Sequence, residues 1–113
     1  MILFFALFPL AALADDAVVE AVETRAGPDG WYFSVTLRHG DTGWEDYADA
    51  WRVVDASGRE LGLRILHHPH VEEQPFTRSL ADVQIPEEMR EVFVEARTNR
   101  DGWGRARYPV SLK

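Results

Sequence analysis

The stretch WYFSVTLRH (residues 31–39) decides the fold class, because large apolar and polar side chains alternate along it without a break. In a β-strand, successive side chains point to opposite faces, so an alternation of this kind gives one apolar and one polar face. The apolar face would consist of Trp31, Phe33, Val35 and Leu37. The stretch therefore predicts a strand with one side against a hydrophobic core.

Further strand and turn signals extend from this stretch in both directions. The segment AVVEAVETR (17–25) precedes it across the turn GPDG (27–30), which predicts a hairpin. Downstream, the sequence predicts strands at 48–55, 60–68, 74–80, 91–98 and 105–112, and one helical turn at 85–89. About seven strands with turn signals roughly every 8 to 12 residues are typical of an all-β, antiparallel sandwich.

This strand pattern resembles an immunoglobulin-like or fibronectin type III-like domain that lacks the disulfide, since the chain contains no cysteine. The resemblance implies that Trp51 packs between the two sheets and that loops at the ends of the sandwich carry binding function. A small open barrel is the alternative architecture. The segment HPHVEEQPFTRSL (68–80) is also similar to a segment of small exported bacterial proteins of unassigned activity, which implies export and a β fold but no mechanism.

The first fourteen residues, MILFFALFPLAALA (1–14), carry no charge and end in the small-x-small pattern that signal peptidase accepts. They are too few to cross a hydrocarbon core about 30 Å thick. We therefore expect a secretory signal peptide at 1–14 and a single β-sandwich domain at 15–113. The product would be soluble, periplasmic or secreted, and without a lipid anchor; a short buried helix or a membrane anchor at 1–14 is the alternative.

Charge and motif content exclude several function classes. The net charge is −7 and the twelve basic residues are scattered, so the basic stripe of a nucleic-acid binder is absent and stable membrane insertion after signal cleavage is not expected. No nucleophile elbow, zinc-protease motif, phosphate loop or dinucleotide fingerprint is present. We therefore expect no enzymatic activity and assign no catalytic residue.

Three of the four histidines stand in the stretch RILHHPHVEEQPF (64–76). If the apolar residues at 61, 63 and 65 face the core, then His67 continues that face inward or lies at its rim, and His68 lies on the opposite face. His70 and Glu72 share the face of His68 provided that the chain stays extended through Pro69.

Residues on one face of a strand are roughly 6.5 to 7 Å apart, a spacing at which two imidazoles can converge on one Zn²⁺ or Cu²⁺ ion. The segment 67–70 thus predicts a periplasmic copper- or zinc-binding protein as one possible function, with the ligands His68, His70, Glu72 and His67. The other interpretation is a polar connecting loop whose histidines are solvated or bonded to glutamate. No cofactor besides copper or zinc is expected.

Aromatic side chains in two further loops are candidates for partner binding. Trp44 and Tyr47 lie among acidic residues in GDTGWEDYADAW (40–51), and Trp103 lies in the turn NRDGWG (99–104). Such residues either cover the end of the core or form contacts with a partner. The leading hypothesis is therefore an exported, soluble, non-enzymatic binding domain that contacts a protein or an envelope component through its end loops.

Overall fold

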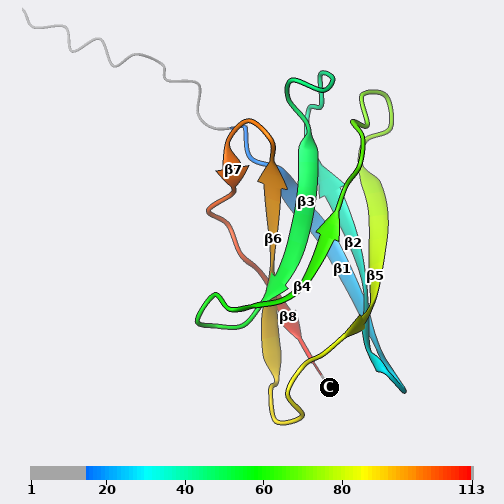
Figure 1. The fold of residues 1–113 in the computed structure, drawn as a ribbon, viewed down its shortest axis with the longest axis vertical. Coiled ribbons are helices and arrows are strands. Elements are labelled where there is room, and N and C mark those ends of the chain that lie inside the picture. Colours follow the sequence, from blue (N-terminus) through cyan, green and yellow to red (C-terminus); the bar gives the residue numbers. More distant parts are fainter. Residues whose placement is uncertain (1–14, 113) are drawn as a thin grey trace, which may run out of the picture.

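The computed structural model describes residues 15–112, which form two antiparallel β-sheets packed face to face (Figure 1). One sheet has three strands in the order β1-β2-β5, and the other has the order β4-β3-β6-β7, with β8 also paired to β6. The strands of the described residues are β1 (Val18–Gly27), β2 (Gly30–Arg38), β3 (Ala48–Val54), β4 (Glu60–Ile65), β5 (Phe76–Val83), β6 (Glu91–Thr98), β7 (Gly102–Trp103) and β8 (Tyr108–Ser111). The predicted all-β sandwich is confirmed, and the short β7 is an addition to the seven strands expected.

Strand β2 forms the centre of the three-stranded sheet, as its alternation predicts. Phe33, Val35 and Leu37 are completely buried, and Trp31 packs partly against the same core. Strand β1 pairs with β2 along its length across the predicted hairpin turn, and β5 pairs with the other side of β2. Strand β5, which corresponds to the strand predicted at 74–80, lies at the edge of this sheet.

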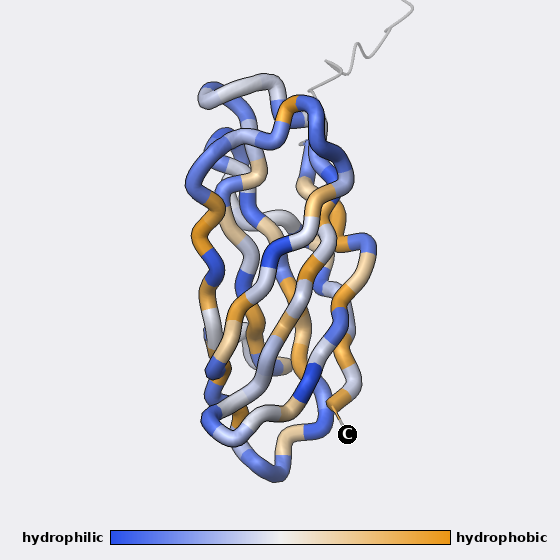
Figure 2. The backbone as a smooth tube through the Cα atoms, turned by 90° about the vertical axis from the view of Figure 1, so that its right-hand side faces the viewer, coloured by the Kyte–Doolittle hydropathy of each residue, from blue (hydrophilic) through white to orange (hydrophobic). Residues whose placement is uncertain are grey.

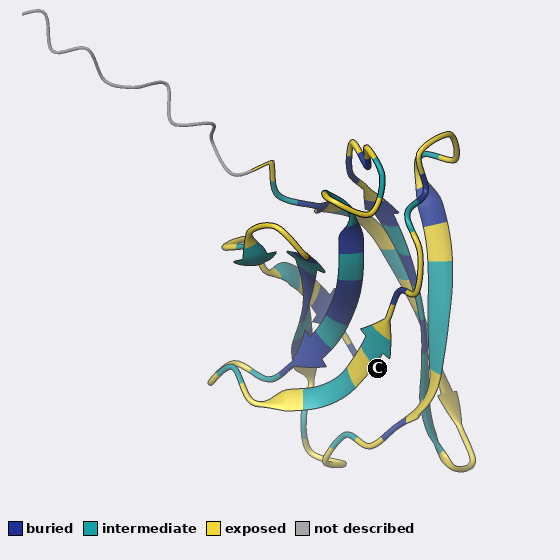
Figure 3. Cartoon of the chain, turned by 45° about the horizontal axis from the view of Figure 1, so that its top comes forward, coloured by how far each residue is buried: buried dark blue, intermediate teal, exposed yellow. Residues whose placement is uncertain are grey.

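The five-stranded sheet contributes Trp51 of β3 as the largest completely buried side chain. Its ring packs between the sheets with Val53 on the same strand and Val94 on β6. Because β3 lies between β4 and β6, it is buried along most of its length, whereas β4 at the edge is largely accessible (Figure 3). The position predicted for Trp51 is confirmed.

The face predicted for β4 is wrong. Leu63 and Ile65 are exposed on the outer side of the sheet, at 39% and 46% of their surface, and Leu66 is buried instead. The reason is a β-bulge: Val53 pairs with Gly62 and Val54 with Glu60, so that Leu61 is an extra residue and reverses the alternation after it.

Gly62 faces inward after the bulge, where a Cβ atom would approach the Leu80 side chain to 3.0 Å and Val83 to 3.2 Å. The small residue lets β4 approach β5 of the other sheet closely. A larger side chain at this position would push the two edge strands apart.

The connections differ from the predictions in three places. The segment 66–75 is a loop and not a continued strand, so the extended conformation assumed through Pro69 is absent. The predicted helical turn is a β-turn closed by the Met89 amide donating to the Pro86 carbonyl at 3.0 Å. The last strand is shorter than expected and begins at Tyr108.

Three connections meet at one end of the sandwich: β2–β3 (39–47), β4–β5 (66–75) and β6–β7 (99–101) (Figure 1). Both ends of the molecule are largely hydrophilic, whereas hydrophobic stretches recur along the strands (Figure 2). Among the residues that the structure describes, no helix is long and apolar enough to span a membrane. The predicted signal peptide at 1–14 lies outside these residues.

The complete burial of Trp51 predicts a large loss of stability on truncation. Trp51→Ala should lower the free energy of unfolding by about 3–5 kcal/mol, because it leaves a cavity between the sheets. Trp44→Ala, at a position that is 65% exposed, is the matched control and should change it by less than about 0.5 kcal/mol. Urea unfolding followed by circular dichroism measures both, and similar losses for the two variants would contradict this assignment of the core.

Candidate functional site

The loop end of the sandwich is organised around the carboxylate of Asp41, which is buried. One oxygen accepts hydrogen bonds from His39 Nδ1 at 2.6 Å and from the Ala48 amide at 3.0 Å. The other oxygen accepts one from the His70 amide at 2.8 Å. We call Asp41 and these three donors the loop clamp, because they join the end of β2, the start of β3 and the β4–β5 loop.

Gln74 adds a second connection between the same segments. Its side-chain oxygen accepts from the His39 amide at 3.0 Å, and its side-chain nitrogen donates to the His70 carbonyl at 3.0 Å. The His39 imidazole is itself buried, with the carboxylates of Asp15 and Asp46 3.7 and 3.8 Å from Nε2. These separations are too long for hydrogen bonds, so within the described residues Nε2 has no hydrogen-bond partner, whereas Nδ1 donates to Asp41.

The structure separates the four predicted metal ligands. His67 and Glu72 are exposed, and His68 is exposed with Nδ1 3.2 Å from the carbonyl oxygen of Pro69. His70 is buried, and its ring stacks on Phe76 with centroids 3.9 Å apart. The rings of His68 and His70 do lie close, at 4.7 Å, but residues 15–112 contain no group of three histidine or carboxylate side chains that could hold a metal ion.

The protonation state of His70 follows from its neighbours. Arg78 Nη2 lies 2.8 Å from His70 Nε2, and a guanidinium can only donate, so Nε2 accepts and is not available as a metal ligand. Burial lowers the pKa of His70 below its ordinary value, and the positive charges of Arg78 and His68 lower it further. His70 is therefore a neutral acceptor in the folded protein.

The three aromatic candidates lie at the same end of the molecule. The rings of Trp44 and Tyr47 meet edge to face with centroids 5.6 Å apart. Asn99, in the β6–β7 turn, holds this loop: its side chain accepts from the Tyr47 amide at 2.9 Å and donates to the Trp44 carbonyl at 2.8 Å. Trp103 lies in β7, directly after this turn.

Tyr47 and Trp103 line a hollow of about 340 Å³ on the outer face of the five-stranded sheet. We call it the outer-face hollow. Ala50 forms part of its floor, where a small side chain leaves room, and an ion pair between Arg97 and Asp49 borders it. The remaining wall consists of β4 and the residues after it: Leu63, Ile65, Leu66 and His67.

Trp103 is held in place by a layer of charged side chains. The Arg52 guanidinium lies over its ring at 3.9 Å from the centroid and also binds the Glu95 carboxylate at 2.8 and 2.9 Å. Arg107 binds the other oxygen of Glu95 at 2.9 Å. Since Glu95 is buried, these charge-assisted contacts hold the indole ring in place.

Sequence reasoning missed the residues that complete this hollow. Leu63 and Ile65 were assigned to the core because the bulge at Leu61 leaves no mark in the alternation. Asn99 and Glu95 form hydrogen bonds with residues that are 52 and 43 positions away along the chain. A single sequence does not reveal such distant contacts. His67, expected inward or at the rim of the apolar face, is exposed and lines the hollow.

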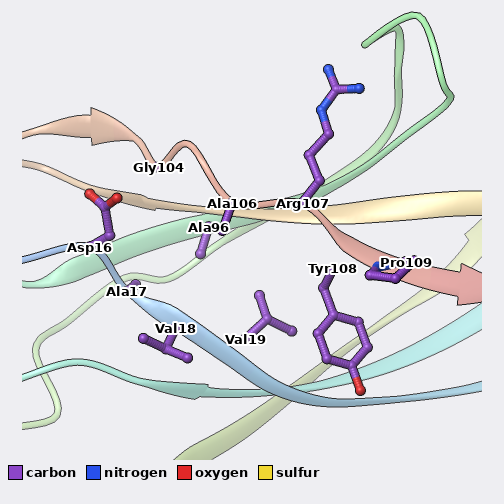
Figure 4. Close-up of a pocket in the computed structure, with 10 residues that line it drawn as sticks. All are labelled: Asp16, Ala17, Val18, Val19, Ala96, Gly104, Ala106, Arg107, Tyr108 and Pro109. Carbon is purple, nitrogen blue, oxygen red and sulfur yellow. The ribbon is translucent and has the colours of Figure 1, made fainter.

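A second hollow, of about 190 Å³, lies at the seam between β1 and the segment before β8 (Figure 4). In Figure 4, the side chain of Val19 and the ring of Tyr108 project into the space between these segments, whereas the guanidinium of Arg107 points away. The lining of this hollow is mostly apolar, whereas a ligand pocket usually contains polar groups that orient the ligand. We therefore assign no binding role to this seam.

No family model and no solved structure matches the chain. Over 92 residues it is 39% identical to a protein of Halomicrobium mukohataei described as a "Putative lipoprotein". The matched part covers 81% of this chain and 45% of that protein, so the chain spans about half the length of this relative.

The lowered pKa of His70 predicts a specific pH dependence of stability. Protonation favours the unfolded chain, so stability contributed by neutral His70 is complete above the ordinary value of 6.5 and decreases as the pH falls below it. His70→Gln, which retains an acceptor for Arg78, should lose less stability than the wild type between about pH 8 and about pH 5.

Urea unfolding at both pH values measures this difference. The carboxylates are the same in both proteins, so their contributions to the pH dependence of stability cancel in the comparison. His67→Gln, at an exposed position, is the control and should behave like the wild type. An identical pH dependence in His70→Gln and the wild type would show that His70 titrates in the same way in the folded and unfolded chains.

Proposed function

We propose that this chain is an exported, non-enzymatic domain that binds a protein partner through the outer-face hollow. The observation that carries the proposal is the clustering of Leu63, Ile65 and Trp103 around one hollow of a sheet face, with two of the three well exposed. Contiguous exposed apolar surface is unusual on a monomeric protein and marks interaction sites. Aromatic anchors beside aliphatic side chains are typical of the centre of such sites.

The rigidity of the hollow supports the same proposal. Arg52 and Glu95 hold Trp103, and Asn99 holds Tyr47, so few side chains need to be ordered when a partner binds. Preorganisation reduces the entropy lost on association. The arginine and histidine at the border of the hollow, Arg97 and His67, supply the polar rim that a protein interface requires.

The comparison supports export. A relative described as a lipoprotein suggests that this domain works outside the cytoplasm at a cell envelope, periplasmic or secreted. The apolar segment 1–14 fits the same proposal.

The strand order bears on the fold resemblance. Strand β4 pairs with β3, whereas the fourth strand of a constant-type immunoglobulin domain joins the other sheet. The fibronectin type III-like alternative is therefore favoured.

The metal-binding alternative is not favoured by any contact in the described residues. Its two central ligands, His68 and His70, differ in exposure, and the accepting nitrogen of His70 is occupied by Arg78. The segment 66–75 serves the loop clamp instead, through the His70 amide and Gln74.

A photo-crosslinking amino acid at Ile65 tests the proposal. In the envelope fraction of cells that produce the protein, we expect one defined protein to be crosslinked from position 65, and none from position 21, which is exposed on the opposite sheet. Leu63→Glu should abolish this product, because binding an apolar partner surface would remove the glutamate charge from water at a cost in free energy. The same products from both positions, or a product indifferent to Leu63→Glu, would contradict the proposal.

Once the partner is identified, Trp103→Ala provides the quantitative test. We expect its affinity to fall at least about tenfold, since truncation of an aromatic hot-spot residue costs about 2 kcal/mol or more and about 1.4 kcal/mol corresponds to a factor of ten. Trp44→Ala, outside the hollow, is the control. Binding to a neutral glycan array that depends on Trp103, without a crosslinked protein, would assign the hollow to carbohydrate and overturn the protein partner.

A further inference from the structure

The outer face of the three-stranded sheet is lined with hydroxyl groups, on the side of the molecule opposite the outer-face hollow. Ser34 pairs in register with Ser79, and Thr36 with Thr77. The two threonine hydroxyls lie 2.7 Å apart. Tyr32 continues this row along β2. Such a face offers many donors and acceptors but little apolar surface.

Two arginines lie at the edge formed by β5, and each pairs in register with a buried residue, Arg78 with Val35 and Arg64 with Trp51. Arg78 comes from β5 itself, and Arg64 comes from the edge strand β4 of the other sheet. Both line one hollow of about 220 Å³ together with Tyr32, Ser34, Thr77 and Ser79. We call it the arginine–hydroxyl hollow.

Arg64 is the less satisfied of the two guanidinium groups. Within residues 15–112 it has no ion pair, and its Nε atom is buried without a hydrogen-bond partner. A buried donor without an acceptor costs about 1–3 kcal/mol, and more when the group is charged. A ligand that accepts hydrogen bonds and carries negative charge would reduce this cost.

The charge of Arg78 is only partly balanced. It donates to the Thr77 carbonyl at 2.7 Å and to the neutral His70. The nearest carboxylate, Glu73, is 3.6 Å away and largely exposed, and Glu23, which pairs in register with Ser34, is exposed on the neighbouring strand. Positive charge therefore predominates in this hollow, although the whole chain carries a net charge of −7.

We propose that the arginine–hydroxyl hollow binds a tetrahedral oxyanion, either sulfate or phosphate. Arginine presents planar, forked donors that match two oxygens of such an anion, and serine and threonine hydroxyls can donate to the others. The same group could come from a free ion or from an ester on an envelope polysaccharide. The site is separate from the outer-face hollow and does not depend on the proposed protein partner.

The competing explanation for Arg64 is protection of the sheet edge. An inward-pointing charge on an edge strand discourages pairing with another chain. This explanation predicts that replacing Arg64 causes association of the protein and does not affect anion binding. The two explanations therefore differ in the property that responds to the substitution.

Isothermal titration with sodium sulfate and with sodium phosphate, against sodium chloride at matched ionic strength, tests the proposal. We expect one-to-one binding of sulfate or phosphate by the wild type, with an increase of the thermal midpoint by mass action. Arg64→Gln should weaken binding at least about tenfold. Arg59→Gln, at an exposed arginine of the β3–β4 turn, is the matched control and should bind like the wild type.

The folding of each variant is verified by its circular dichroism spectrum and its state of association by sedimentation. A sulfated oligosaccharide that binds more tightly than inorganic sulfate would identify the polysaccharide as the source, and equal affinity would identify the free ion. Sulfate and phosphate effects no larger than those of chloride would overturn the proposal. Unchanged anion binding by Arg64→Gln, with or without self-association, would also overturn it.

Discussion

The buried carboxylate of Asp41 is the constraint on which the loop end of this protein depends. Three donors from separate segments converge on it: the His39 ring, the Ala48 amide and the His70 amide. Hydrogen bonds to a charged acceptor are worth more than neutral ones, and removal of the Asp41 carboxylate would leave all three donors without their acceptor in a buried site. The ends of both sheets are thereby held in one arrangement, although the sandwich core itself is made by Trp51 and the valines around it.

The positions of the candidate binding residues follow from this arrangement. Tyr47 precedes Ala48, whose amide belongs to the loop clamp. The Tyr47 amide in turn donates to the side chain of Asn99, in the turn that precedes Trp103. His70 belongs to the clamp through its backbone, while its side chain accepts from Arg78 at the border of the arginine–hydroxyl hollow. Within the histidine-rich segment, His70 thus contributes to the loop clamp through its backbone and contacts Arg78 through its ring.

The fold could be predicted from the sequence to the extent that local alternation determines it. The face of β2 that carries Phe33 was correct because the strand is regular and half-buried, and the hairpin before it follows from a strong turn signal. The face of β4 was wrong because one bulged residue, Leu61, reverses every side chain after it. A bulge of this kind depends on pairing with β3, which a single sequence does not reveal.

The candidate site could be predicted only in its aromatic residues. Tyr47 and Trp103 are large aromatic side chains near turn signals, a combination visible in the sequence, and both line the outer-face hollow, whereas Trp44 contacts Tyr47 outside it. The histidines were interpreted from their spacing alone. The structure shows that the backbone amide of His70 donates to Asp41, which is 29 residues earlier in the chain. Contacts over such separations decide which polar residue is buried and which is free.

Amide hydrogen exchange of Asp41→Asn compared with the wild type tests the central role of this carboxylate most directly. The amide nitrogen of asparagine cannot accept, so at least one of the three hydrogen bonds must be lost while the size of the side chain is kept. We predict faster exchange, by about tenfold or more, at the Ala48 and His70 amides, and unchanged exchange at Val35 and Val94 in the core strands. Undiminished protection at Ala48 and His70, or an equal increase throughout the chain, would contradict the account.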